Sequence, residues 1–156
     1  MKKFILLVVL MTSVISSYAV EIATCQNPIG KAFYHFAGLT DKAGAGWAED
    51  KITNGNSTLI QLDDGSFDIL YLDGRKKPIS SLQNGGLVRL LRRGSTNLTL
   101  IVFYPNATTE IYSFFREKDG RNRFTQMQNK TGDDAAFPKS SVMVGDCEII
   151  QFNLVK

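Results

Sequence analysis

The chain has 156 residues, with 18 Lys and Arg against 15 Asp and Glu and a single His. A chain of this length fits one domain and can bury a sizeable core without a metal. Its charge is close to balance, which argues against nucleic acid as a partner. One His and two Cys are too few for a zinc site. No other metal or cofactor motif stands out in the sequence, so we expect no metal and no cofactor.

The first 19 residues have the layout of a secretory signal peptide. Two lysines give a positive start, residues 4–15 form a mostly apolar run, and Ser17 and Ala19 are small residues before a cleavage site. The apolar run is shorter than the roughly 20 residues of a membrane-spanning helix. We therefore expect cleavage after Ala19. We also expect residues 20–156 to be exported from a bacterial cell, into the periplasm or beyond, as a single β-rich domain without a membrane span.

Cys25 and Cys147 lie near the two ends of the exported part. Disulfides persist in oxidising compartments, and two cysteines allow only one intramolecular pairing. We therefore expect a bridge that encloses most of the domain. An alternative is lipidation of Cys25, because Ile22-Ala23-Thr24 before it resembles a lipobox. Thr24 fits the last position of that motif poorly, and lipidation would leave Cys147 alone.

Residues 28–39 are a candidate for one short helix near the start of the domain. Phe33, Phe36 and Ala37 have helical spacing within residues 28–39. Further along, Gly, Asn and Asp residues separate short runs rich in β-branched and aromatic residues, which is typical of antiparallel strands. In chain order, strands are expected at residues 47–53, 57–62, 67–72, 87–92, 98–104, 108–115, 122–128, 140–144 and 147–152.

The expected fold is all-β, apart from that helix. Tight turns join consecutive strands, for example Asp63-Asp64-Gly65 and, between the last two strands, Gly145-Asp146. Such an antiparallel meander closes as a small barrel, lipocalin-like in shape, or folds as a sandwich, because either arrangement limits exposed strand edges. We favour the barrel, since strands joined by tight turns pair with their neighbours.

Aromatic residues gather in the strands of the second half of the chain. They are either ordinary core residues or the lining of a pocket for an apolar ligand. The candidate pocket residues are Phe103, Tyr104, Tyr112, Phe114, Phe115 and Phe124.

No motif in the sequence marks a catalytic residue. His35 stands in an aromatic segment, and no GxSxG motif accompanies it. Asp50, Asp68, Glu110 and Glu148 are candidates for a carboxylate pair that hydrolyses glycosidic bonds, although nothing in the sequence selects two of them. A small secreted hydrolase that uses acidic residues is therefore the alternative function.

The segments GWAEDKI, FDILYLD, YPNATTEIYSF and KSSVMVGDCEIIQF are spread over most of the exported part. Together they resemble a group of small exported bacterial proteins, and the VMVGxC-type segment around Cys147 is the most distinctive of them. The resemblance implies a bacterial, exported protein and implies no catalytic residue. We expect a monomeric, non-enzymatic binding protein. Its partner is either a small apolar ligand in the aromatic interior or a protein held by exposed loops.

Overall fold

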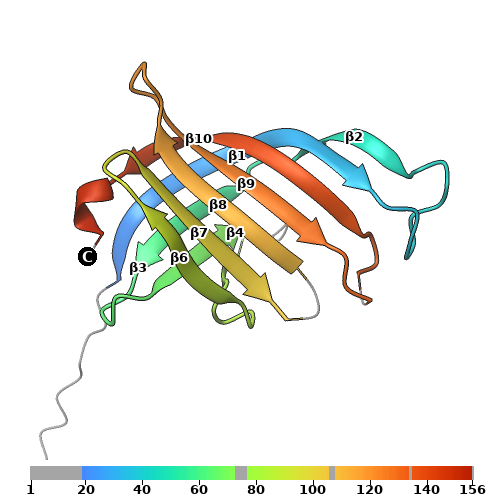
Figure 1. Cartoon of the computed structure of the whole chain (residues 1–156), viewed down its shortest axis with the longest axis horizontal. Coiled ribbons are helices and arrows are strands. Elements are labelled where there is room, and N and C mark those ends of the chain that lie inside the picture. Colours follow the sequence, from blue (N-terminus) through green and yellow to red (C-terminus); the bar gives the residue numbers. More distant parts are fainter. Residues whose placement is uncertain (1–18, 73–76, 106–107, 134, 156) are drawn as a thin grey trace, which may run out of the picture.

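The computed structural model describes residues 19–72, 77–105, 108–133 and 135–155, which form one antiparallel sheet of ten strands (Figure 1). The expected signal peptide lies outside the described residues except for Ala19. No helix in the described ranges is long and apolar enough to cross a membrane. The strands are β1 (Val20–Tyr34), β2 (Gly46–Lys51), β3 (Asn56–Gln61), β4 (Phe67–Leu72), β5 (Pro78–Ser80), β6 (Leu87–Arg93), β7 (Asn97–Tyr104), β8 (Thr108–Arg116), β9 (Asn122–Lys130) and β10 (Lys139–Ile150), followed by the 3₁₀ helix η1 (Phe152–Leu154).

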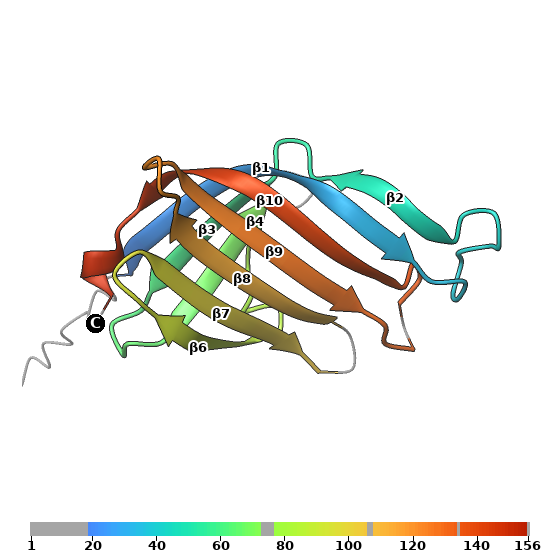
Figure 2. The ribbon, with the colours of Figure 1, turned by 45° about the horizontal axis from the view of Figure 1, so that its top comes forward.

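The sheet is curled into a half-barrel (Figure 2). Its strand order is β5-β4-β3-β1-β10-β9-β8-β7-β6, and β2 pairs with β1. The expected all-β antiparallel fold is confirmed. In the described ranges, however, no ladder of hydrogen bonds joins the outermost strands β5 and β6, so strand pairing does not close the barrel.

The prediction of a helix at residues 28–39 is wrong. Through Tyr34 this segment is the second half of β1, and Phe33 lies opposite both Trp47 of β2 and Ser140 of β10. Partners on both edges of the strand outweigh the helical spacing of its aromatic residues, because strand preference depends on packing against neighbouring strands. The first half of β1 and the short β5 were not expected from the sequence.

The predicted hairpin at Gly145-Asp146 is also wrong, because both residues lie inside the continuous strand β10. Gly145 pairs with Phe124 of β9. A Cβ atom on Gly145 would collide with the Phe124 ring and lie 2.7 Å from the Gln26 carbonyl oxygen of β1. The glycine therefore permits close approach of neighbouring groups, which is the other common reason for glycine within a strand.

Strand β1 bends where its second partner changes. It pairs with β10 from Ala23 to Tyr34, while its other edge pairs first with β3 and then with β2. The register shifts between Gln26 and Ile29, and Asn27 has a φ of 50°. Such a bulge bends a strand and increases its twist. Just beyond it, a Cβ on Gly30 would collide with the carbonyl oxygen of Val142 in β10.

The expected disulfide is confirmed. Cys25 of β1 and Cys147 of β10 lie directly opposite each other, are bonded, and are separated by 122 positions in the sequence. Because the Cys25 sulfur is used in this bond, the structure argues against lipidation of Cys25. The bond indicates an oxidising, extracytoplasmic environment.

The core fills the end of the half-barrel that carries the C-terminus. Apolar side chains alternate along the strands and face inward there, and the Phe114 ring stacks between Tyr112 and Phe124 at centroid distances of 6.4 and 6.1 Å. The buried cluster also contains Ile22, Leu59, Ile69, Leu98, Leu100, Ile150, Phe152 and Val155. The inner face is polar toward the other end, where β1, β7 and β9 finish and β8 and β10 begin.

Loss of the disulfide should lower the free energy of unfolding. For a loop of about 120 residues the chain-entropy model gives a loss of about 5 kcal/mol. Urea unfolding followed by circular dichroism should show a lower midpoint for the double variant Cys25→Ala, Cys147→Ala than for the oxidised protein. Equal midpoints with equal slopes would contradict this expectation.

Gly30→Ala should destabilise the protein by about 3 kcal/mol or more, because the new methyl group meets β10 backbone atoms that cannot move independently. Gly44→Ala is the matched control. Its new Cβ would have the flexible Asp41 carboxylate, at 3.2 Å, as its nearest neighbour, and the expected change is within about 0.5 kcal/mol. Thermal unfolding of both variants tests the argument, which fails if they unfold at the same temperature.

Candidate functional site

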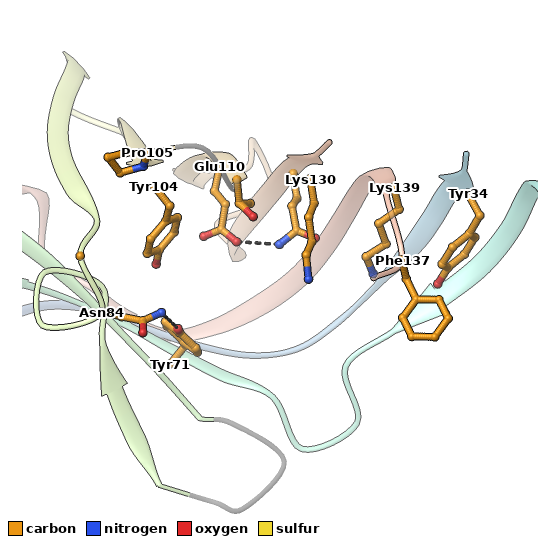
Figure 3. Close-up of a pocket in the computed structure, with 12 residues that line it drawn as sticks. Tyr34, Tyr71, Asn84, Tyr104, Pro105, Glu110, Lys130, Phe137 and Lys139 are labelled. Carbon is orange, nitrogen blue, oxygen red and sulfur yellow. Dashed lines mark hydrogen bonds between the residues drawn. The ribbon is translucent and has the colours of Figure 1, made fainter. Parts of the chain in front are cut away.

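A solvent-open cavity of about 930 Å³ occupies the polar end of the half-barrel (Figure 3). A smaller space of about 180 Å³ adjoins it and shares Tyr71, Glu110 and Gln128 with it. The larger cavity is lined by Tyr34, Tyr71, Asn84, Gly85, Tyr104, Pro105, Thr108, Glu110, Gln128, Lys130, Phe137 and Lys139.

Strand register explains which side chains reach the cavity. Successive residues of a strand point to opposite faces, so the buried Phe114 places Tyr112, Glu110 and Thr108 on the same inner face. Their partners on β9, from the core toward the opening, are Phe124, Gln126, Gln128 and Lys130. The inner face thus changes from apolar, through hydrogen-bonding, to charged groups along the strands.

Glu110 is the buried acid of the cavity and is only 7% exposed. Its carboxylate accepts hydrogen bonds from the Tyr112 hydroxyl at 2.9 Å and from the Gln128 amide at 2.7 Å. The Tyr112 hydroxyl in turn accepts one from the Gln126 amide at 2.9 Å. All these donors are neutral, and no Lys or Arg of the described ranges forms an ion pair with Glu110.

Two tyrosines near Glu110 resist ionisation. Burial, followed by the negative charge of Glu110, raises the pKa of Tyr112 well above its ordinary value. Burial is also the main cause that raises the pKa of Tyr104, which donates a hydrogen bond to the Ser81 hydroxyl at 3.1 Å. Both phenols therefore act as hydrogen-bonding groups and not as negative charges.

The two lysines of the cavity differ in their partners. The Lys139 ammonium lies 2.6 Å from an Asp50 carboxylate oxygen and 5.7 Å from the centre of the Tyr34 ring. Lys130 is half-buried and lies beside Lys139 across the β9–β10 pairing. In contrast to Lys139, its ammonium has no hydrogen bond or ion pair with any residue that the structure describes.

The six aromatic residues proposed from the sequence fall into three groups. Tyr104 lines the large cavity and Tyr112 the smaller one. Phe114 and Phe124 pack in the core. The remaining two, Phe103 and Phe115, alternate with inward-facing residues and so lie on the outer face, where Phe103 is 45% exposed.

The candidate acids other than Glu110 are held elsewhere. Asp50 pairs with Lys139, and Asp68 is buried against the Ser80 hydroxyl and the Leu82 amide. Glu148 is exposed and accepts a hydrogen bond from Gln26. The structure therefore brings no two of the four proposed acids together in the cavity lining that it describes.

His35 lies outside the cavity lining, and its ring nitrogen is 3.3 Å from the Ser140 hydroxyl. No group of three or more His, Cys, Asp or Glu residues in the described ranges is arranged to hold a metal ion.

The outer face of the sheet carries an apolar surface that was not expected from the sequence. Trp47 is 72% exposed and packs edge-on against Phe33 at 5.5 Å. With Ile111 of β8, Met127 of β9 and Val142 of β10, Trp47 lines a groove of about 260 Å³. Exposed apolar patches of this kind often mark contact sites.

Several cavity residues were missed from the sequence, above all Lys130, Lys139 and Tyr34. The two-residue alternation in β8 is a local signal that could have placed Glu110 beside Tyr112 on the inner face. The position of both lysines depends on the register between β8, β9 and β10, which links residues far apart in the chain.

Comparisons of the chain with protein-family models, with curated proteins and with solved structures find no match.

Tyr104 and Tyr112 should remain protonated in the folded protein at a pH where an exposed tyrosine, with a pKa of about 10, has ionised. Since the pKa of each is raised on folding, their contribution to stability is complete below about pH 10 and is lost as the pH rises further. An alkaline titration followed by tyrosinate absorbance should show late ionisation coupled to unfolding. Tyr112→Phe should remove one late group. Ionisation of every tyrosine near pH 10 in the folded state would contradict the assignment.

Proposed function

We propose that this protein is an exported binding protein that holds a small molecule in the cavity of its half-barrel. The observation that carries the proposal is a solvent-open cavity of about 930 Å³, with a hydrogen-bonded carboxylate at its base and tyrosine rings around it. Ligand sites in proteins are typically concave, measure about 300–1,000 Å³ and contain a few fixed polar groups that orient the ligand.

The lining favours an amphipathic ligand over the wholly apolar one expected from the sequence. Glu110, Lys130 and Lys139 would lose contact with water against a wholly apolar molecule, and this is unfavourable without compensating hydrogen bonds. Tyr71 and Tyr104 combine an apolar ring with a hydroxyl group. A ligand with an apolar body and polar ends would satisfy both kinds of group.

Hydrolysis receives less support from the geometry. A glycosidase of the usual kind places two carboxyl groups on either side of the bond that it cleaves. In the described lining, the acid is Glu110, while Asp50 forms an ion pair with Lys139 at the edge. The other proposed acids, Asp68 and Glu148, are hydrogen-bonded away from the cavity. Binding without turnover is therefore the better-supported proposal.

Two features support export. The first 19 residues have a signal-peptide pattern, and the Cys25–Cys147 bond suits an oxidising compartment. We propose a periplasmic or secreted location, which accounts for both features. The sequence also predicts a protein partner as the alternative to a small ligand. The outer apolar surface around Trp47 is the area that such a partner would contact, and protein binding stays a prediction.

Blocking the cavity should weaken small-molecule binding. The probe is anilinonaphthalene sulfonate (ANS), whose rings and sulfonate suit the tyrosines and lysines. Thr108→Trp places a large side chain on the inner face, whereas Thr109→Trp changes the next residue of β8, on the outer face. We expect the Thr108 variant to weaken ANS binding about tenfold or more, which is about 1.4 kcal/mol, and the Thr109 variant to leave it nearly unchanged.

Isothermal titration calorimetry of the oxidised protein and both variants measures these affinities, with circular dichroism as the check on folding. A loss of ANS binding in the Thr109 variant alone would assign the dye to the outer groove. Failure of the unmodified protein to bind ANS would likewise count against the cavity as a ligand site.

A further inference from the structure

We infer that the cavity takes a small zwitterion, whose ammonium group contacts Glu110 and whose anionic group contacts Lys130; this inference rests on the proposed function and specifies its ligand.

Glu110 supplies the site for the ammonium group. A buried carboxylate is unfavourable unless a cation or several hydrogen bonds compensate it. The Glu110 carboxylate accepts two hydrogen bonds from neutral donors, yet an ionised carboxylate has about four acceptor positions. Since Glu110 lines both the large cavity and the adjoining space, a ligand ammonium entering there reaches the remaining positions.

Aromatic rings around Glu110 suit the same group. Tyr71 and Tyr104 line the large cavity with Glu110, and Tyr112 borders the adjoining space. A cation near the face of an aromatic ring is attracted by the ring quadrupole. Tyr104 and Tyr112 stay neutral, because burial raises the pKa of both phenols, so neither adds a further charge beside Glu110.

Lys130 supplies the site for the anionic group. Its neighbour Lys139 is neutralised by Asp50, while the Lys130 ammonium has no ion-pair partner in the described ranges. Figure 3 shows the Lys130 and Glu110 side chains directed into the same cavity. An anion entering this end of the half-barrel therefore meets one cation that is already paired and one that is available.

The register places Glu110 and Lys130 at separate positions on the inner face. Glu110 lies opposite Gln128, so Lys130, two residues further along β9, is its diagonal neighbour on the inner face. The backbone positions of diagonal neighbours in an antiparallel pair lie roughly 7–8 Å apart. Glu110 is the deeper of the two, since it lies one row nearer to the core. A ligand with a single charge leaves one of these groups without a counter-charge, and a zwitterion with separated charges compensates both.

A matched series of benzyl compounds tests the inference. The probes are para-aminomethylbenzoate, which is a zwitterion, benzylamine, benzoate and benzyl alcohol. Titrations of the oxidised, isotope-labelled protein, followed by the NMR shifts of backbone amides, give the affinity and the location of each probe. We expect the zwitterion to bind in the cavity about tenfold more tightly than any other member, because each of its charged ends finds its own partner.

Single substitutions assign the two ends. Glu110→Gln should weaken the zwitterion and benzylamine about tenfold and leave benzoate nearly unchanged. Lys130→Gln should weaken the zwitterion and benzoate but not benzylamine. Glu148→Gln is the matched control, because this carboxylate is exposed and does not line the cavity, and all four affinities should stay unchanged.

Three results would overturn the inference. If benzylamine or benzoate binds the cavity as tightly as the zwitterion, the zwitterion is the wrong ligand class, although the proposed function stands. If no probe shifts the cavity amides and ANS also fails to bind, the proposed function falls as well. If Glu110→Gln does not fold, the probe series and the Lys130→Gln variant still test the inference, because Lys130 is only half-buried. An unchanged affinity of Lys130→Gln for the zwitterion overturns the inference.

Discussion

The antiparallel pairing of β1 with β10 joins the first and last strands of the described chain, and the Cys25–Cys147 bond fixes that pairing directly. These two long strands form the centre of the sheet. Strands β3, β4 and β5 follow on the side of β1, and β9, β8, β7 and β6 follow on the side of β10. Because β1 also pairs with β2 and β3, its geometry sets the position of four strands, its own included. Gly30 and Gly145 allow the close backbone approach on which this arrangement depends.

The bend in β1 divides the interior into two parts with different physical character. Before the bulge at Asn27, β1 carries Ile22 and Cys25 into the buried cluster, where hydrophobic burial stabilises the fold. Beyond the bulge β1 reaches Tyr34, in the cavity wall. The strands from β7 to β10 run through both parts, so one register positions the core rings and the polar groups of the cavity.

The strands joined by short turns could be predicted from the sequence, because their two-residue alternation and their turn residues are local signals. Strand β8, expected at residues 108–115 and observed at Thr108–Arg116, is an example. Strand β1 could not be predicted in this way, because what makes it a strand is its pairing with other segments: β10, more than 100 positions away, on one edge, and β2 and β3 on the other. Gly145 was misread because a glycine that permits close approach and a glycine in a turn look the same in a sequence.

The candidate site shows the same limit. Glu110 was one acid among four until the fold showed that it is buried and faces the cavity. A buried carboxylate without a cation does not stabilise a fold, since an apolar side chain of similar size is often neutral or better there. The core around Phe114 and the disulfide stabilise this protein, and Tyr112 links that core to Glu110 through its hydroxyl group. The cavity end retains two charged side chains, Glu110 and Lys130, that no ion pair in the described residues compensates, and this is the physical basis for proposing a binding site there.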